Sequence, residues 1–277
     1  MNFTFEHDIV CTGVTMDMNE MRLYLIDYLK NENKRYADVE IPRDEYSQRR
    51  LLQGLFNIRE VQDVPEDFLK IQDEYLTRRA EEKGITRIED LSPVRDDLYI
   101  WQGDITTLSC DAIVNAANSK LLGCWAPCHD CIDNAIHTYA GIQLRADCDK
   151  LMKKQGYDEP TGMAKITKAY NLPCRYVLHT VGPIIYDTVT DEHRNLLASC
   201  YTSCLDKAYE NGLASIAFCC ISTGIFRFPN REAAEIAVRT VEEYRRAKNY
   251  DVKIIFNVFK DKDKEIYNSI LHRGRSI

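Results

Sequence analysis

Residues 98–119, LYIWQGDITTLSCDAIVNAANS, contain two short apolar runs that are each followed by a polar loop. The runs at 98–101 and 112–114 are dominated by aliphatic and aromatic residues, which are typical of buried strands. The loops begin at Gly103 and Asn115 and carry turn-forming residues with polar side chains. This stretch therefore predicts two strands of a sheet, with polar groups at their carboxyl ends.

The chain beyond this stretch continues to alternate between strand-like and helix-like segments. Further strands are predicted at 176–180, 216–221 and 253–259, and helices from 133 onward and at 192–211, 230–249 and 261–271. Strands separated by helices form a parallel or mixed sheet with helices on both faces. The predicted fold class is therefore α/β, in which ligands bind outside the carboxyl ends of the strands.

The first 92 residues differ from the rest, because they are rich in charge and poor in glycine. Three amphipathic stretches recur at helical spacing, the first after an Asp17 or Thr15 cap and the third after Pro65. Their apolar positions are Met18, Met21, Leu25 and Leu29, then Leu51, Leu52, Leu55 and Phe56, then Phe68, Ile71 and Tyr75. We expect a helical extension over residues 1–92, acting as a structural lid or interaction surface, and a second domain over residues 93–277.

Composition limits the partners and the compartment. The 277 residues include 36 Lys or Arg and 43 Asp or Glu, and the net charge of −7 disfavours duplex nucleic acid as a partner. The sequence shows neither a secretory signal nor an apolar run long enough to cross a membrane. The eleven cysteines are an odd number, and without a secretory signal they are expected to stay reduced. We therefore expect a cytoplasmic protein without a disulfide framework.

The loops after the strands are ambiguous when each is taken alone. Asp104 could expose a carboxylate to an exocyclic amine or cap the following turn, and the asparagines of VNAANS could bind a ligand or form turns. The loop at 222–229, STGIFRFP, could face an anion with its backbone N–H groups, while Phe226 and Phe228 could wall a sugar or a base. This loop lacks the glycine patterns of the P-loop and of dinucleotide-binding motifs.

Taken together and in order, five short motifs resemble the macrodomain family of ADP-ribose-binding modules. They are GDIT (103–106), VNAANS (114–119), PTGMAKIT (160–167), HTVGP (179–183) and STGIFRFP (222–229). The resemblance covers about residues 98–271. It implies a three-layer α/β/α fold with a mixed, largely parallel central sheet, preceded here by the helical extension.

The resemblance also implies how ADP-ribose would be held. Asp104 would hold the adenine amino group and Ile105 the adenine ring through its backbone, while Asn118 would touch the distal ribose. The pyrophosphate would be wrapped by Ser222, Thr223, Gly224, Ile225 and Phe226, with Phe226 packed against the distal ribose. Because loop amides can hold one pyrophosphate, the net charge of −7 does not oppose this expectation.

Residues 123–137, GCWAPCHDCIDNAIH, depart from the run of glycines that many macrodomains carry after the asparagine loop. Three thiols and an imidazole within eight residues suit Zn²⁺. Cys124, His129 and Cys131 could converge if the chain turns, whereas Cys128 would diverge from its neighbour His129 on an extended chain. A Cys₂His set leaves one zinc position open, as in catalytic sites; a closed Cys₃His structural site and a metal-free thiol cluster remain alternatives.

This stretch is similar to that of the zinc-dependent macrodomains, which remove ADP-ribose from proteins and carry a helical N-terminal extension. The resemblance implies one Zn²⁺ per chain and an ADP-ribosylated protein as substrate. Such proteins often occur beside sirtuin-type ADP-ribosyltransferases in microbes, which suggests a lipoylated carrier protein as the modified partner. The expected activity is that of a protein mono-ADP-ribosyl hydrolase.

Two residues are expected to carry the chemistry beside the metal. Asp133 would orient or deprotonate water, or serve as the N-cap of the predicted helix, and Asn118 would position the sugar. We expect His137 to pack or to support the site and His179 to form hydrogen bonds in the core. Two other functions stay open: a module that binds ADP-ribosylated proteins without cleaving them and uses zinc structurally, and a hydrolase of O-acetyl-ADP-ribose.

Overall fold

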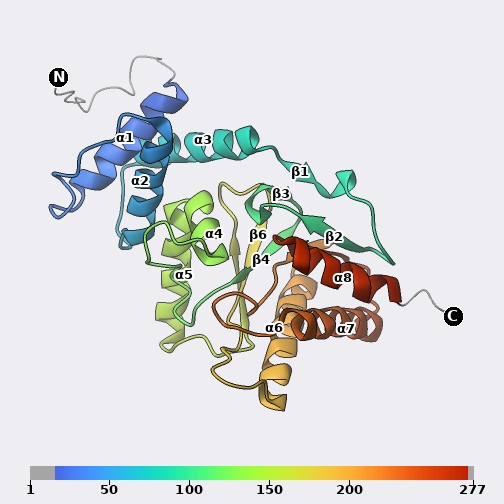
Figure 1. Ribbon diagram of the computed structural model, residues 1–277. Coiled ribbons are helices and arrows are strands. Elements are labelled where there is room, and N and C mark those ends of the chain that lie inside the picture. Colours follow the sequence, from blue (N-terminus) through green and yellow to red (C-terminus); the bar gives the residue numbers. More distant parts are fainter. Residues whose placement is uncertain (1–15, 274–277) are drawn as a thin grey trace.

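The computed structural model describes residues 16–273, which form a helical extension followed by a sheet between two layers of helices (Figure 1). The extension consists of α1 (Met18–Asn31), α2 (Glu45–Ile58) and α3 (Glu66–Lys83). The elements that follow are β1 (Thr86–Arg87), β2 (Leu98–Gln102), β3 (Leu108–Ser109), β4 (Ala112–Ala116), α4 (Ile132–Ala140), α5 (Ile142–Gln155), β5 (Ala164–Lys168), β6 (Tyr176–Thr180), α6 (Asp191–Glu210), β7 (Ser215–Phe218), α7 (Asn230–Lys248), β8 (Lys253–Val258) and α8 (Asp261–Arg273).

The main sheet has six strands in the order β2-β8-β7-β4-β6-β5. β5 runs antiparallel to β6, and the other four pairings are parallel. Ile113 and Val114 of β4 and Ile216 and Ala217 of β7 are fully buried, as expected for central strands covered on both faces. The carboxyl ends of the parallel strands therefore meet at one edge of the sheet.

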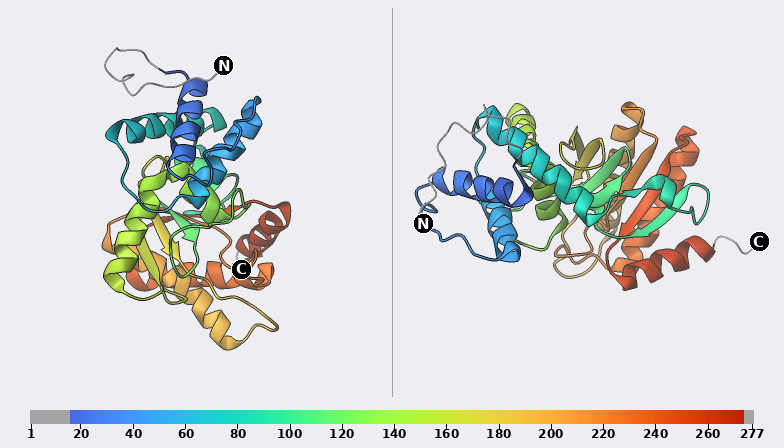
Figure 2. Two further views of the ribbon diagram at one scale, coloured as in Figure 1. Left: turned by 90° about the vertical axis from the view of Figure 1, so that its left-hand side faces the viewer. Right: turned by 90° about the horizontal axis from the view of Figure 1, so that it is seen from above.

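Helices cover both faces of this sheet, as the alternating pattern predicts. α6, α7 and α8 pack in a row, with α6 on β5 and β6 and α8 on β2 and β8. α4 and α5 pack together on the other face, where α4 contacts β4 and α5 contacts β5 (Figure 2). The apolar side chains between the layers form one continuous core. The three-layer α/β/α architecture expected from the macrodomain resemblance is confirmed.

The extension encloses a small core of its own. Met21, Leu25 and Phe68, from α1 and α3, are fully buried in it and are joined by leucines of α2. Asp17 caps α1 by accepting backbone N–H groups of the first turn at 2.8 Å, whereas Thr15 lies outside the described residues. α2 and α3 both contact α4, so the extension lies against the helix that directly follows the loop containing Cys124, Cys128 and Cys131 (Figure 1).

The structure also contains elements that the sequence patterns did not indicate. β5 and α5 are additions, since β5 is short and α5 alternates charged and apolar residues without a wide apolar stripe. The strand predicted at 216–221 ends at Phe218, because its pairing with β8 stops there. Cys219 and Cys220 therefore belong to the loop after β7. No helix among residues 16–273 is long and apolar enough to cross a membrane.

Phe68 tests how far this small core stabilises the extension. Its fully buried ring packs on the ring of Tyr28, with a centroid distance of 4.6 Å. We expect Phe68→Ala to lower the free energy of unfolding, measured by urea titration, by about 3–5 kcal/mol. Phe68→Leu, which keeps most of the volume, should lose clearly less. A loss below about 1 kcal/mol for the alanine variant would show that this core contributes little.

Candidate active site

A cavity of about 620 Å³ opens at the carboxyl ends of the central strands. Its wall is built by the segments that follow β4, β7 and β8, as the rule for open α/β sheets predicts. Of the residues expected to be functional, those that line it are Asn118, Cys124, His129, Cys131, Asp133, Ser222, Thr223, Gly224, Ile225 and Phe226.

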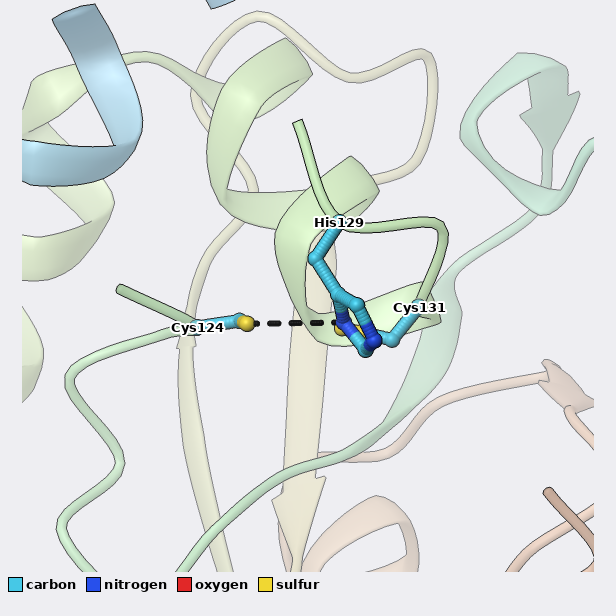
Figure 3. A group of neighbouring side chains, drawn as sticks. All are labelled: Cys124, His129 and Cys131. Carbon is cyan, nitrogen blue, oxygen red and sulfur yellow. Dashed lines mark hydrogen bonds between the residues drawn. The ribbon is translucent and has the colours of Figure 1, made fainter. Parts of the chain in front are cut away.

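Cys124, His129 and Cys131 meet on one side of this cavity (Figure 3). Their ligand atoms all lie within 4.8 Å of one another, and Cys124 Sγ is 3.6 Å from His129 Nδ1. The loop turns between them, because the N–H of His129 donates to the carbonyl of Ala126 at 3.2 Å and Cys128 adopts a left-handed φ of 55°. The three ligands proposed from the sequence are thus brought together.

The donor set and the spacing fit a tetrahedral zinc ion. Zn–S bonds of about 2.3 Å and Zn–N bonds of about 2.05 Å place sulfur and nitrogen about 3.5 Å apart at tetrahedral angles. The observed distance between Cys124 Sγ and His129 Nδ1 is 3.6 Å. Burial raises the pKa of the Cys131 thiol to about 12, so its thiolate would depend on a nearby cation. Three protein ligands leave one position for water or a substrate oxygen.

Cys128 takes no part in this cluster. Its thiol donates to the backbone carbonyl of Arg50 at 3.0 Å, and its N–H donates to Asn57 Oδ1 at 2.9 Å. Both partners belong to α2, so the side chain of Cys128 faces the extension, away from its neighbour His129. A closed four-ligand site would require breaking these contacts, and the geometry therefore favours the open three-ligand set.

Asp133 lies in the first turn of α4 and is 5% exposed. Its Oδ1 accepts a hydrogen bond from Asn115 Nδ2 at 2.8 Å, and its Oδ2 accepts one from Asn118 Nδ2 at 3.2 Å. Burial raises the pKa of Asp133 to about 6, although the two amide donors act in the opposite direction. The alternative role as helix N-cap is wrong, because Cys131 is the N-cap and its sulfur accepts the N–H of Asn134 at 3.4 Å.

Asn115 orients Asp133, a role that the sequence patterns do not indicate. The residue is fully buried near the end of β4 and lies opposite His179 of β6. Besides its bond to Asp133, Asn115 Nδ2 lies 3.2 Å from His179 Nδ1, and His179 Nε2 lies 2.9 Å from Thr167 Oγ1. Burial lowers the pKa of His179 to about 3, so the ring is neutral; with Nδ1 accepting, Nε2 donates to Thr167. This chain of hydrogen bonds holds an N–H of Asn115 toward Asp133.

A second group of buried side chains, His137, Cys148 and His179, also has ligand atoms within 4.8 Å of one another. Because His179 Nε2 carries a proton donated to Thr167, it lacks a free lone pair for a metal. His137 lies with Nε2 3.5 Å from Asp133 Oδ1, and burial holds its pKa well below the usual range. The group therefore packs beneath the site, in agreement with the expectation for both histidines.

The loop after β7 faces the cavity with a turn suited to an anion. Ser222 adopts a left-handed φ of 63°, and its buried Oγ has no hydrogen-bond partner among residues 16–273. The turn closes through the N–H of Phe228, which donates to the carbonyl of Ser222 at 3.0 Å. Gly182 leaves room for it, because a Cβ there would lie 2.0 Å from Ser222 Oγ. The hydroxyl itself is buried beside Gly182, so an anion in the cavity would meet the backbone of this turn rather than Ser222 Oγ.

Three residues expected at the site lie outside the cavity lining. Phe228 is 1% exposed in the core, so the expectation that it walls a ligand is wrong. Asp104 caps the following turn through its carboxylate and forms an ion pair with Lys83 of α3. Ile105 is buried in the core. The roles of Asp104 and Ile105 toward adenine stay predictions.

Residues that follow β8 complete the far end of the cavity, and the sequence patterns did not single them out. Phe259, which is 77% exposed, Lys260 and Asp263 line it together with Asn257 of β8 and Asn230 of α7. Asp263 is buried, and its Oδ1 accepts a hydrogen bond from Asn230 Nδ2 at 2.6 Å. The rule that ligands bind beyond the carboxyl ends of strands could have indicated Phe259 and Lys260.

Comparisons with known proteins find one family and several relatives. The family described as Macro domain matches residues 114–237. A protein-ADP-ribose hydrolase of Treponema medium is 56% identical over 260 residues, which are 92% of this chain and 100% of the relative. A protein-ADP-ribose hydrolase of Staphylococcus aureus (strain MRSA252) is 47% identical over 262 residues, which are 94% of this chain and 98% of the relative.

Solved structures share the same fold. The Oceanobacillus iheyensis macrodomain with ADP has a TM-score of 0.58 and 37% identity, and the match covers 66% of this chain and 94% of that one. The Trypanosoma brucei macrodomain in complex with ADP-ribose has a TM-score of 0.58 and 30% identity, covering 78% of this chain and 94% of that one.

Gly182 tests whether the loop after β7 needs the space beside it. The Cβ of Gly182→Ala would meet Ser222 Oγ at 2.0 Å and Ile221 Cγ2 at 2.9 Å. We expect a loss of about 1–3 kcal/mol in the free energy of unfolding, measured by urea titration. Adding Ser222→Gly should restore part of it, because the hydroxyl is removed and glycine suits the positive φ. Equal stability of Gly182→Ala and wild type would contradict this.

Proposed function

The chain belongs to the macrodomain family, and we propose that it is a hydrolase that removes mono-ADP-ribose from modified proteins with one zinc ion per chain. The observation that carries this proposal is the meeting of Cys124, His129 and Cys131 beside Asp133 in one cavity. A module that only binds ADP-ribose would need the cavity, but neither an open metal position nor a buried carboxylate beside it.

The relatives support an enzyme. Both the Treponema medium and the Staphylococcus aureus proteins are named protein-ADP-ribose hydrolase, and they match more than nine-tenths of this chain. Residues 93–277 make up about two thirds of the chain, so these matches include most of the helical extension as well. The likeness therefore extends over the site and over the helices that lie against it.

We expect ADP-ribose to lie in the cavity in one direction. The loop at 222–226 lines the cavity and would hold the pyrophosphate through its backbone, with Phe226 packed against the distal ribose. Asn118 also lines the cavity, and its Nδ2 donates to the carbonyl of Gly123 at 3.0 Å, next to Cys124; there it would position the distal ribose. The adenine would then lie toward the far end, for which Asp104 and Ile105 are the expected partners by family resemblance.

The bond to be broken joins the anomeric carbon of the distal ribose to a side chain of the modified protein. Water adds its oxygen to that carbon, and the side chain leaves with a proton, through a transition state of oxocarbenium character. Asp133 would accept the proton of the attacking water, while the amides of Asn115 and Asn118 hold its carboxylate in place. Asn118 would also hold the sugar against this carboxylate.

Zinc, held by Cys124, His129 and Cys131, would supply Lewis acidity that polarises a water or a ribose hydroxyl. The same pocket could act on O-acetyl-ADP-ribose, which lacks a protein moiety. We propose the protein substrate, because the relatives are named for protein-linked ADP-ribose. A lipoylated carrier modified by a sirtuin-type transferase is the partner that the family resemblance alone suggests.

Zinc dependence can be measured with an ADP-ribosylated carrier protein and chromatographic detection of free ADP-ribose. We expect a chelator to abolish release and added Zn²⁺ to restore it, because the cluster supplies the metal ligands. Cys124→Ser should behave like the chelated wild type. Undiminished release after complete zinc removal would refute the metal-dependent reaction. Binding of the carrier without any release would favour a module that only binds ADP-ribosylated proteins. A parallel assay with O-acetyl-ADP-ribose tests the remaining alternative, hydrolysis of that compound.

Asp133→Asn tests the role of the carboxylate while keeping its size. We expect kcat to fall about 10²–10⁴-fold, because the amide cannot accept the proton of water. Zinc content and affinity for ADP-ribose, measured by elemental analysis and calorimetry, should match the wild type. Asp187→Asn, at an exposed position outside the cavity lining, is the control and should keep full activity. Turnover within about threefold of wild type for Asp133→Asn would refute this role.

A further inference from the structure

α2 of the extension turns a polar face toward the loop that carries the metal ligands. Arg50, Gln53 and Asn57 are spaced by three and four residues, which places them on one side of the helix. Gly54 lies on the same side, where its Cβ position is 3.7 Å from Pro127 and from Cys128 Sγ. Polar side chains on the inner side of a helix are unusual unless they have specific partners.

The first partner is Cys128, next to the ligand His129. Asn57 Oδ1 accepts the Cys128 N–H at 2.9 Å, while the carbonyl of Arg50 accepts the thiol at 3.0 Å and Arg50 Nη2 donates to the Cys128 carbonyl at 3.3 Å. Asn57 is 1% exposed, and its Nδ2 donates to Thr138 of α4 at 3.0 Å. A left-handed φ at a non-glycine residue persists where its surroundings hold it. α2 supplies these surroundings.

The second partner is Asn134, in the first turn of α4. Gln53 Nε2 donates to Asn134 Oδ1 at 3.0 Å, which orients the amide so that Nδ2 donates to the carbonyl of Ala126 at 3.0 Å. The N–H of Asn134 also donates to the sulfur of the ligand Cys131 at 3.4 Å. One side chain of α2 therefore orients a residue that touches both the middle of the loop and a ligand.

The third contact runs through Arg145 of α5 and reaches the start of the loop. Its guanidinium donates to the carbonyl of Leu122 at 2.7 Å, two residues before the ligand Cys124. The same group donates to the carbonyls of Phe56 and Asn57, at 3.1 and 2.9 Å, at the end of α2. It also lies 4.3 Å from the ring centre of Trp125. Both ends of the loop at 122–128 are thus joined to α2.

We propose that α2 of the extension is a positioning element of the metal centre, and that it holds Cys124, His129 and Cys131 in a geometry ready to bind the ion. This inference rests on the proposed zinc-dependent function. A loop held before the ion arrives loses less conformational entropy on binding, so the supports contribute directly to metal affinity. A lid that only covers the cavity would affect the substrate and leave zinc affinity unchanged.

The test measures the zinc dissociation constant of the full chain by competition with a chromophoric chelator. Asn57→Leu removes the acceptor for the Cys128 N–H, and we expect zinc affinity to fall about 10–100-fold, as for other supports of metal ligands. Asn57→Asp keeps an acceptor for Cys128 and for the hydroxyl of Thr138, so it should retain most of the affinity. Should Asn57→Leu fail to fold, Gln53→Leu, at a half-buried position, carries the same expectation.

The matched control is Gln72→Leu. Gln72 is a fully buried amide of α3 that also joins the extension to the second domain, where it accepts the N–H of Ile142 at 3.1 Å and contacts Gln143. None of these contacts involves the loop at 122–131. We therefore expect Gln72→Leu to lower the free energy of unfolding but to keep the zinc dissociation constant within about twofold of the wild-type value.

Four outcomes are decisive. Zinc bound as tightly by Asn57→Leu as by the wild type, or equal losses in Asn57→Leu and Gln72→Leu, would overturn the positioning role alone. A wild-type chain that binds no zinc would overturn the zinc-dependent function and this inference with it. A loss confined to Asn57→Leu, with Asn57→Asp near wild type, is the result that the contacts predict.

Discussion

The register between β4 and β6 is the constraint on which the site depends. It sets Asn115 opposite His179, so that the imidazole can accept one N–H of the amide while the other reaches Asp133. A slip of one residue would turn Asn115 to the opposite face of the sheet. Thr167 of β5, the strand at the edge of the sheet, hydrogen-bonds to His179 and completes this series of contacts. Three adjacent strands, β4, β6 and β5, therefore orient the buried carboxylate of Asp133.

The loop at 122–131, which carries the candidate metal ligands, illustrates the opposite situation, because it has little regular structure of its own. The candidate ligands are close in sequence, yet the path of the loop is held by hydrogen bonds to α2 and α5. The extension has its own apolar core and is therefore able to act as a firm support. Loops that carry function generally rely on a rigid scaffold, and here part of that scaffold precedes the macrodomain in the chain.

The sequence predicts which side chains come together where the information is local, and fails where it is not. Cys124, His129 and Cys131 lie within eight residues, so chemistry and spacing are sufficient to predict that these three meet and that Cys128 stays apart. The prediction that Phe228 walls the ligand is wrong, because the sequence of the loop does not show which aromatic ring turns inward. The sequence indicates only a ligand-binding or turn-forming role for Asn115, because its contact with His179 depends on a strand more than sixty residues away.

By itself the sequence determined the α/β class, the helical extension, the loops that surround the cavity and the three clustered metal-ligand candidates. These features follow from hydrophobic periodicity and from donors that are neighbours along the chain. Tertiary structure decided that Cys131 rather than Asp133 caps α4, that Asp104 pairs with Lys83, and that α2 lies against the loop of the metal-ligand candidates. Those outcomes depend on packing between distant segments, whose geometry no short stretch of sequence encodes.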